Sequence, residues 1–335
     1  MNLDLRTKYL GLALKNPLVV SACPLTHKLD VLQELEAAGA AAAVLPSLFE
    51  EQIEHEEVEM TKAREFGTDS FAEALTYFPE ADDYRSGPEN YLEFIAEAKK
   101  AVTIPIIASL NGTSEGGWVR YAKLMQDAGA DALELNIYLV ATDLETTSAD
   151  IEKRYLDLVS AVKKSVSVPL AVKVGPYFSS MGNMAKRLVE AGADGLVLFN
   201  RFLQPDIDLN TLELHPKLEL SSPFELLKPL RWIAILHGRL DASLALTGGI
   251  HQAPDLAKAL LAGADVGMVA SVLYNEGVDH LSTILEGLAA WMVENEYDSV
   301  EQLKGSMSQE NCPNPAAFER GNYMKALVSF TGEAI

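Results

Sequence analysis

The chain has 335 residues, of which 48% are hydrophobic and 22% are charged. This is the composition of a folded globular protein, and it excludes disordered, collagen-like and disulfide-rich chains. The formal net charge of −21 gives an acidic surface that repels nucleic-acid backbones, so we expect a soluble protein with no nucleic-acid partner.

The sequence gives no sign of export or membrane insertion. Its apolar runs are far shorter than the ~20 residues of a membrane span, so no membrane partner is expected. Residues 1–17 alternate charged and apolar side chains, unlike a secretory signal. Two cysteines, Cys23 and Cys312, suit neither a disulfide framework nor a zinc site and favour the cytoplasm. Because no linker interrupts the chain, residues 1–335 are expected to form one domain.

A short phrase, Ala-Gly-Ala followed by an apolar run, recurs four times along the chain. A glycine just past a helix adopts the left-handed conformation that ends it. An apolar run buried on both faces is typical of a parallel strand. The phrase therefore predicts strands at residues 41–47, 131–138, 194–200 and 265–271.

Four further apolar runs complete an alternating pattern of strands and helices. They predict strands at residues 17–22, 104–110, 169–175 and 244–249. Amphipathic periodicity predicts helices at residues 28–38, 89–101, 115–128, 149–165, 180–191, 223–237, 253–262 and 277–294. Eight strand–helix units in one domain predict a (β/α)8 TIM barrel, and the alternative is a doubly wound open sheet.

Three segments lie outside this alternation. Residues 1–16 precede the first barrel strand and are expected to form a hairpin that closes the bottom of the barrel. Long connections at residues 48–88 and 201–221 follow the second and sixth strands, and the second of them alternates like a hairpin. Both leave the carboxyl ends of strands, where barrel active sites are built, so we expect them to act as lids or walls.

Small residues at the ends of the last two strands predict a phosphate site. Gly248 and Gly249 end the seventh strand, and Ala270 and Ser271 end the eighth. Bare backbone turns near helix N-termini offer N–H groups to a phosphate, as in many barrels. The alternative is that the glycine pair forms a purely structural turn.

Three polar side chains end the central strands. Lys173 lies in an otherwise apolar strand, which is costly unless its ammonium meets an anion or polar ligand. A cation at the N1/O2 edge of a flavin would stabilise the reduced ring, and the alternative is a lysine that extends past the barrel rim. The amides of Asn136 and Asn200 can hydrogen-bond the donor and acceptor edges of a planar heterocycle.

These motifs occur in an order that identifies a family. With ELN at residues 134–136, VKVGPYF at 172–178, FN at 199–200 and TGGI at 247–250, the chain resembles the dihydroorotate dehydrogenases over essentially its whole length. It is most similar to their soluble class 1 branch. The resemblance implies an FMN-dependent barrel enzyme that oxidises dihydroorotate, a small molecule, to orotate in pyrimidine biosynthesis. It also implies a homodimer.

The resemblance implies a set of FMN contacts, with Lys173 in the role at the flavin ring described above. The set comprises Ala22, Cys23, Ser47, Asn136, Lys173, Phe199, Ser222, Gly248, Gly249, Ala270 and Ser271. Asn136, Asn200 and Arg201 are the expected substrate-binding residues. No metal ligand is implied.

The substrate half departs from the family pattern. The family's catalytic base, a Cys or a Ser, lies in a loop that runs roughly Asn-Leu-Ser-Cys-Pro-Asn. Here that stretch is residues 136–141, and Leu139 stands at the position of the base. Pro46 and Ser47 stand where the family has Lys-Ser, and the following substrate-binding Asn is not evident at residues 70–79. Proton abstraction is therefore expected to be impaired.

Several candidate residues have two interpretations. Tyr138 is a candidate acid or base, or a ring that stacks on substrate, and an unperturbed tyrosine is a poor base at neutral pH. Arg201 either binds a substrate carboxylate or forms a surface salt bridge. Cys23 is either redox-active or a packed thiol, with packing favoured. His27 and His55 are expected to be structural.

The function hypotheses differ in whether flavin is bound. The first is an FMN oxidoreductase acting on dihydroorotate, with Tyr138 and Lys173 as catalytic candidates. The second is a flavin oxidoreductase with a different small substrate. The others are a phosphate-binding barrel synthase or lyase without flavin, and a non-catalytic flavin-binding subunit. No GxGxxG follows a strand, so direct nicotinamide binding by a Rossmann unit is not supported.

Overall fold

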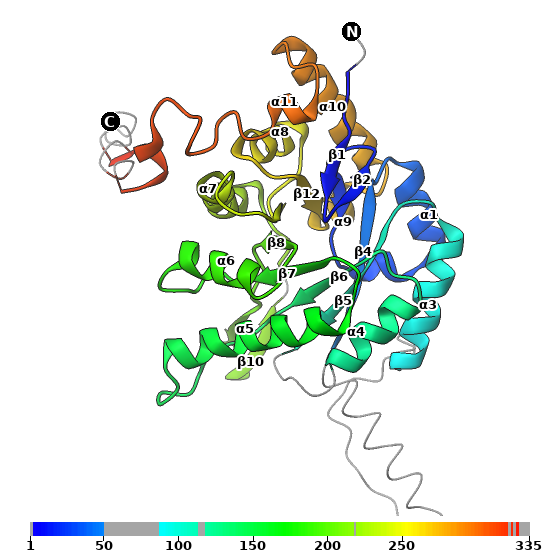
Figure 1. Cartoon of the computed structure of the whole chain (residues 1–335), viewed down its shortest axis with the longest axis vertical. Helices are drawn as coiled ribbons and strands as arrows, with labels where there is room; N and C mark the ends of the chain where they lie inside the picture. The colour runs from blue at the N-terminus through cyan, green and yellow to red at the C-terminus, as the bar shows by residue number, and fades with distance from the viewer. Residues whose placement is uncertain are drawn as a thin grey trace, which may run out of the picture.

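Eight parallel strands close into a barrel, which confirms the predicted (β/α)8 architecture and excludes the open sheet (Figure 1). The computed structural model describes residues 3–49, 87–112, 118–217 and 219–320, with residues 323, 326 and 327. The strands, in their order around the barrel, are β3 (Leu18–Val20), β4 (Ala42–Phe49), β5 (Ile106–Asn111), β6 (Ala132–Asn136), β7 (Leu170–Val174), β8 (Gly195–Leu198), β11 (Ser243–Thr247) and β12 (Val266–Val269). Pairing of β12 with β3 closes the ring.

Helices cover the outside of the barrel close to the predicted positions. The longer ones are α1 (Leu29–Ala37), α3 (Pro88–Ala101), α4 (Trp118–Asp127), α5 (Ser148–Ser165), α6 (Met181–Glu190), α7 (Leu227–Leu236), α8 (Ala253–Ala262) and α10 (His280–Glu294). The shorter ones are η1 (Pro24–His27), η2 (Pro223–Leu226), α9 (Ser271–Glu276), α11 (Val300–Leu303) and η3 (Pro315–Phe318). The last predicted helix begins later than expected because Gly277, with φ 84°, separates α9 from α10.

The repeated phrase has the conformation that the sequence predicts. Gly39, Gly129, Gly192 and Gly263 all have φ between 105° and 116°, in the left-handed region that ends a helix. Each glycine is followed by a strand of the barrel. The chain therefore turns from helix to strand in the same way at four places.

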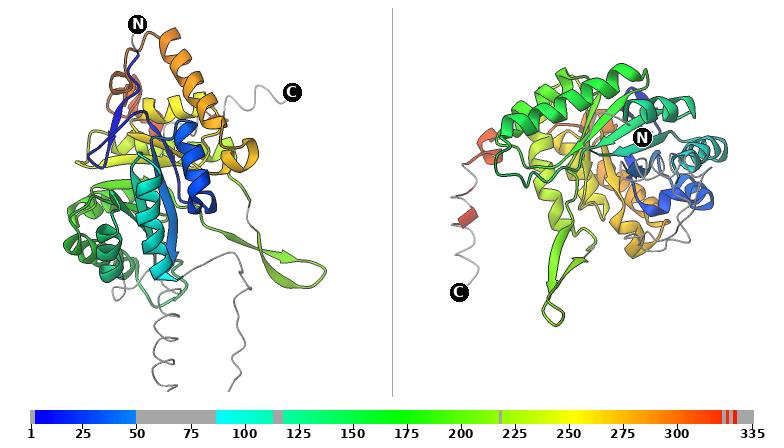
Figure 2. Two further views of the ribbon diagram at one scale, coloured as in Figure 1. Left: turned by 90° about the vertical axis from the view of Figure 1, so that its right-hand side faces the viewer. Right: turned by 90° about the horizontal axis from the view of Figure 1, so that it is seen from below.

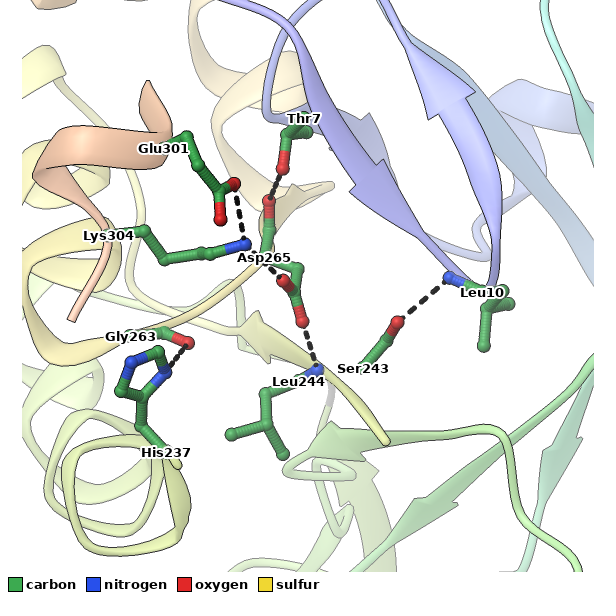
Figure 3. Close-up of polar contacts among 9 residues, drawn as sticks. All are labelled: Thr7, Leu10, His237, Ser243, Leu244, Gly263, Asp265, Glu301 and Lys304. Atoms are coloured by element: carbon green, nitrogen blue, oxygen red, sulfur yellow. Dashed lines mark hydrogen bonds and ion pairs between the residues drawn. The ribbon is translucent and has the colours of Figure 1, made fainter. Parts of the chain in front are cut away.

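An aspartate after three of these phrases ties neighbouring barrel units together. Oδ2 of Asp131 accepts hydrogen bonds from the backbone N–H of Ile106 and from Nζ of Lys99, both at 2.7 Å. Corresponding contacts join Asp194 to Leu170 and Lys163, and Asp265 to Leu244 and Lys304 (Figure 3). Each carboxylate thus satisfies a backbone donor at the start of the preceding strand.

The predicted N-terminal hairpin closes the bottom of the barrel. Strands β1 (Thr7–Tyr9) and β2 (Leu12–Leu14) are antiparallel, and Tyr9, Leu10 and Leu14 pack against the inward-facing side chains of the barrel strands. Two hydrogen bonds fix the hairpin, from Thr7 Oγ1 to the Asp265 carbonyl and from the Leu10 N–H to Ser243 Oγ (Figure 3). Both are 3.0 Å long.

The second long connection forms the predicted hairpin. Strands β9 (Gln204–Asp208) and β10 (Glu213–Lys217) pair antiparallel and extend away from the barrel (Figure 2). Large apolar side chains on this hairpin and its turn are exposed: Ile207, Leu209, Leu212 and Leu214. The other long connection, at residues 48–88, lies outside the described residues except for its ends. In the described part of the chain, no helix is long and apolar enough to cross a membrane.

Candidate functional site

Strand register places two charged side chains inside the barrel, next to its carboxyl end. Alternate residues of a strand face the same side of a sheet. Ala132 and Ala171 belong to the interior cluster of the barrel, so Glu134 and Lys173, two positions further on, also face inward. Lys173 is paired in register with Asn136, the last residue of β6.

Lys173 forms an ion pair that lies out of solvent. Its Nζ is 3.4 Å from Oε1 of Glu134, and the side chains of Lys173 and Glu134 are 9% and 0% exposed. The ammonium therefore meets an anion of the protein itself, and the alternative of a lysine that extends past the rim is wrong. Sequence reasoning missed Glu134, although it is a charged residue within an apolar strand, which was the signal used for Lys173.

The two asparagines at the strand ends are in contact. Nδ2 of Asn200 donates a hydrogen bond to Oδ1 of Asn136, and the Asn200 backbone N–H donates to the Val174 carbonyl at 2.8 Å. Asn136 is buried and Asn200 half-buried. Within the described part of the chain, Nδ2 of Asn136 and Oδ1 of Asn200 make no hydrogen bond. One donor and one acceptor are thus available to a ligand.

Tyr138, Tyr177 and Phe202, which follow β6, β7 and β8, form an aromatic cluster. The Tyr138 ring stacks on Phe202 with 4.4 Å between centroids, and Tyr177 meets Phe202 edge-on at 5.2 Å. Oη of Tyr138 accepts a hydrogen bond of 3.1 Å from the backbone N–H of Leu203, at the base of the β9–β10 hairpin. Tyr138 therefore anchors the hairpin to the end of β6.

Leu139, at the position of the family's base, has no group that accepts a proton. Its side chain is half-buried and packs against the hydrophobic core. Burial raises the pKa of the nearby Tyr155 phenol to about 12. A hydrogen bond with the Leu139 backbone lowers that pKa, but by less than burial raises it. The structure therefore places a packed aliphatic side chain, with no proton acceptor, at this position.

The glycine pair after β11 has the backbone conformation of a tight turn. Gly248 and Gly249 have φ of 92° and 80°. A Cβ on Gly249 would lie 2.3 Å from the backbone nitrogen of Leu226, whereas a Cβ on Gly248 would meet no atom of the described residues within 4 Å. Only glycine fits at residue 249, and the described part of the chain leaves the space above Gly248 open.

The remaining expected phosphate-binding residues lie in η2 and at the end of β12, the strand that pairs with β11. Leu226, whose backbone lies close to Gly249, ends η2, and Ser222 holds the N-cap position of η2 without a side-chain capping hydrogen bond. The neighbouring Ser221 donates its backbone N–H to Oγ of Ser271 at 3.0 Å. Ala270, directly before Ser271, has φ −146° and ψ −58° at the end of β12. Because β11 and β12 pair in parallel, the ends of these two strands lie together, as the sequence predicts.

Residues at the ends of the first two barrel strands are small and mostly covered. Cys23 is buried, which raises the pKa of its thiol, although backbone hydrogen bonds and the charge of Lys173 partly oppose this. Ala22 packs against the interior cluster. Ser47 Oγ lies 2.8 Å from Ser109 Oγ. A covered, protonated thiol fits the packing role for Cys23 better than a redox role.

Phe199 and Arg201 flank Asn200. The Phe199 side chain is buried. Arg201 forms a half-exposed ion pair with Glu225, with 3.5 Å between its Nη2 and Oε1, which is the alternative to a role in carboxylate binding. It borders a shallow hollow of about 230 Å³ at the base of the hairpin. That hollow is lined by Arg201, Phe202, Leu203, Gln204, Pro205, Asp206 and Glu219.

Of the two histidines expected to be structural, His27 lies among the described residues. His27 stacks on Phe94 with 4.6 Å between ring centroids, and His55 lies outside the described residues. Across residues 3–49, 87–112, 118–217 and 219–320, no group of three His, Cys, Asp or Glu side chains is arranged to hold a metal.

Comparison with known proteins identifies a family. Residues 84–292 match the family model described as dihydroorotate dehydrogenase. The chain is 27% identical to the catalytic subunit of dihydroorotate dehydrogenase B (NAD(+)) of Thermoplasma acidophilum, over 90% of this chain and 98% of that one. It is also 27% identical to the NAD-dependent dihydropyrimidine dehydrogenase subunit PreA of Escherichia coli K12, over 62% of this chain and 54% of that one.

Proposed function

The chain belongs to the dihydroorotate dehydrogenase family, and on that premise we propose that it binds FMN at the carboxyl ends of the barrel strands and oxidises a small planar substrate there. Family membership makes it an oxidoreductase similar to dihydroorotate dehydrogenase.

The observation that carries this proposal is the buried Lys173 beside the Asn136–Asn200 pair. A lysine enclosed in a barrel at its carboxyl end is expensive to keep charged, and Glu134 satisfies only part of it. The ammonium suits the electron-rich N1/O2 edge of a flavin. The open space above Gly248 suits a phosphate group approached by backbone N–H groups. The donor set present therefore fits FMN.

Bound FMN would supply a hydride acceptor, and the residues of this chain would supply the rest. Lys173 would hold positive charge beside the ring as it gains electrons. The turn at Gly248 and Gly249, together with Ser222, Ala270 and Ser271, would hold the phosphate group. Ala22, Cys23, Ser47 and Phe199 would form the covered surface around the ring. The free donor of Asn136 and the free acceptor of Asn200 would orient the substrate, with Arg201 near a substrate carboxylate.

The proposed substrate is dihydroorotate, which would place the enzyme in pyrimidine biosynthesis in the cytoplasm. Two relatives are named for dihydroorotate and dihydropyrimidine, and both substrates are small rings with a saturated carbon–carbon bond. A second candidate is a different small ring, and the apolar Leu139 beside the aromatic cluster favours it. A homodimer remains the expected assembly.

Anaerobic reduction of the flavin tests the proposal. The purified chain should carry or take up FMN and show flavin absorbance, and dihydroorotate or a related dihydropyrimidine should bleach it. A protein that takes up no FMN in a titration would overturn cofactor and reaction together. Bleaching by chemical reductant but by neither substrate would retain the cofactor and favour the second candidate.

A further inference from the structure

Glu134 is the most enclosed charged residue near the candidate site. Its side chain is 0% exposed, and among the described residues only Oε1 has a partner, Nζ of Lys173. Oε2 is buried without a hydrogen bond in that part of the chain. Desolvating a carboxylate is costly, and a single contact of 3.4 Å recovers little of that cost. Glu134 is therefore poorly explained as a stabilising residue.

Among the described residues, the interior layer below Glu134 holds no second positive charge. Ala132 and Ala171 form the next layer, and Tyr9 of the N-terminal hairpin packs with them. The Tyr9 hydroxyl is fully buried, and no described residue hydrogen-bonds it. Burial, followed by the charges of Glu134 and Asp265, raises the pKa of Tyr9 well above its usual value. Tyr9 thus remains neutral, and Glu134 acts chiefly on Lys173.

Glu134 is also one residue layer further from the open end than Asn136. Asn136 ends β6 and is paired in register with Lys173, whereas Glu134 is paired with Ala171. A ligand at the strand ends would therefore meet Lys173 first, with the carboxylate behind it. A negative charge behind an ammonium both fixes its position and reduces the positive potential in front of it.

We propose that Glu134 is a positioning residue that sets the flavin reduction potential through Lys173. The carboxylate holds Nζ at the ends of β6 and β7 and offsets part of its charge. The bound flavin then has a lower reduction potential than it would have beside an unpaired lysine. This inference rests on the proposed FMN site.

Spectroelectrochemical titration of the FMN-loaded protein tests the inference. Glu134→Gln should raise the flavin potential by at least about 30 mV, which corresponds to a tenfold change in a two-electron equilibrium. In a Lys173→Met background, the same substitution should have a much smaller effect, because the residue through which it acts is gone. An equal shift in both backgrounds, or no shift in either, would overturn the proposal.

Asp265→Asn provides the matched control, because it also removes a carboxylate paired with a lysine, but before β12, at the amino end of the barrel. It should leave the potential unchanged. Glu134→Asp retains the charge on a shorter side chain and should shift the potential less than Glu134→Gln. A larger shift for the aspartate variant would contradict the argument from charge.

Thermal unfolding of the apoprotein tests the pairing without flavin. Lys173→Met leaves Glu134 buried without its partner, so the melting temperature should fall further than in the double variant Lys173→Met, Glu134→Gln. A double variant at least as unstable as the single variant would overturn the pairing. Because this measurement needs no FMN, failure of the proposed function is distinguishable from failure of this inference.

Discussion

Nζ of Lys304 lies 2.9 Å from Oδ1 of Asp265, while Oδ2 of the same carboxylate accepts a hydrogen bond from the backbone N–H of Leu244 (Figure 3). Burial lowers the pKa of Lys304, but its ion pairs with Asp265 and Glu301 outweigh this and raise the pKa above the usual value of a lysine. Asp265 thereby joins β11, β12 and the segment after α11 at the amino end of the barrel.

The Lys304 ion pair predicts a stability difference that disappears at alkaline pH. Lys304→Met should lower the free energy of unfolding by about 1–3 kcal/mol near neutral pH, because it leaves a carboxylate oxygen without its donor. The folded-state pKa is raised, so this contribution is complete below about pH 10 and is lost as the pH rises through the folded-state value. Urea unfolding at about pH 8 and pH 11 measures the change. The exposed Lys100→Met is the control, and a pH-independent difference would contradict the assignment.

The barrel was predictable because its signals are local. Helix end, left-handed glycine and apolar strand follow one another within a few residues at Gly39, Gly129, Gly192 and Gly263, and the structure has the same turn at each. Partners that are distant in sequence were not predictable in this way. Lys304 follows Asp265 by 39 positions and has no periodic relation to it. Such a contact depends on how the C-terminal segment packs.

The candidate site was predictable in part. Residue type and position at a strand end were enough to select Asn136, Asn200 and Lys173, and the structure brings the two asparagines together. The partner of Lys173 depends on the register between β6 and β7, which no single strand encodes. The partner of Arg201 was not predictable either, because its surface ion pair with Glu225 depends on the path of the connection before η2.

Replacing Gly248 or Gly249 with alanine should have different effects on stability and on FMN affinity. Gly249→Ala should destabilise the fold, by about 1–2 kcal/mol for the left-handed conformation and about 1–3 kcal/mol for overlap with the Leu226 backbone. Gly248→Ala should cost only the conformational part, yet its methyl group enters the open space of the proposed phosphate site. FMN affinity should fall at least about tenfold.

Gly11→Ala is the control for the Gly248 variant. Gly11 has φ 75° and open space around its Cβ position, but it lies in the N-terminal hairpin, at the other end of the barrel. It should lower the melting temperature by a similar amount and leave FMN affinity unchanged. Fluorescence titration with FMN measures the affinities. Equal affinity of Gly248→Ala and the unmodified chain would place the phosphate elsewhere.

Replacing Lys173 should change the reduction potential of bound flavin more than it changes the affinity for FMN. If its ammonium neutralises charge on the reduced ring, Lys173→Met should lower the flavin potential by at least about 30 mV, a tenfold change in the equilibrium. FMN affinity should change less, because the phosphate contacts remain. Redox titration and FMN titration of the same preparation give both values. An unchanged potential would show that the ammonium does not act on the ring.

The two cysteines should differ in reactivity. Burial raises the pKa of the Cys23 thiol, whereas Cys312 is half-buried near the C-terminal end of the described chain. Because the thiolate is the reactive form, a disulfide reagent should modify Cys312 at least about tenfold faster than Cys23. Cys312→Ser should remove the fast phase, and Cys23→Ser the slow one. A fast phase that survives in Cys312→Ser would show that Cys23 is accessible and reactive.

The contacts of Tyr138 predict that it is not the missing base. Its hydroxyl accepts a hydrogen bond from the Leu203 N–H, and its ring is stacked on Phe202. Tyr138→Phe should therefore leave the rate of flavin reduction by dihydroorotate within about threefold, far less than the 10²- to 10⁴-fold value of a general base. Stopped-flow absorbance measures the rate. A loss of 100-fold or more would assign the proton transfer to Tyr138.

Leu139 stands at the position of the family's base. Its aliphatic side chain cannot accept the proton that dihydroorotate must lose as its hydride leaves, so reduction of bound FMN by this substrate should be slow. Leu139→Cys should raise that rate if Asn136 and Asn200 still orient the ring, because a thiolate then occupies the position of the base. Leu139→Ala is the control, since it opens the same space without supplying a proton acceptor.

The outcomes separate space from chemistry. If Leu139→Cys and Leu139→Ala accelerate flavin reduction equally, the gain comes from space alone. If the unmodified chain already reduces its flavin as fast as Leu139→Cys does, a different residue takes the proton. If neither variant responds while FMN remains bound and chemically reducible, the site is adapted to a different small ring, and the panel of related dihydropyrimidines becomes the decisive measurement.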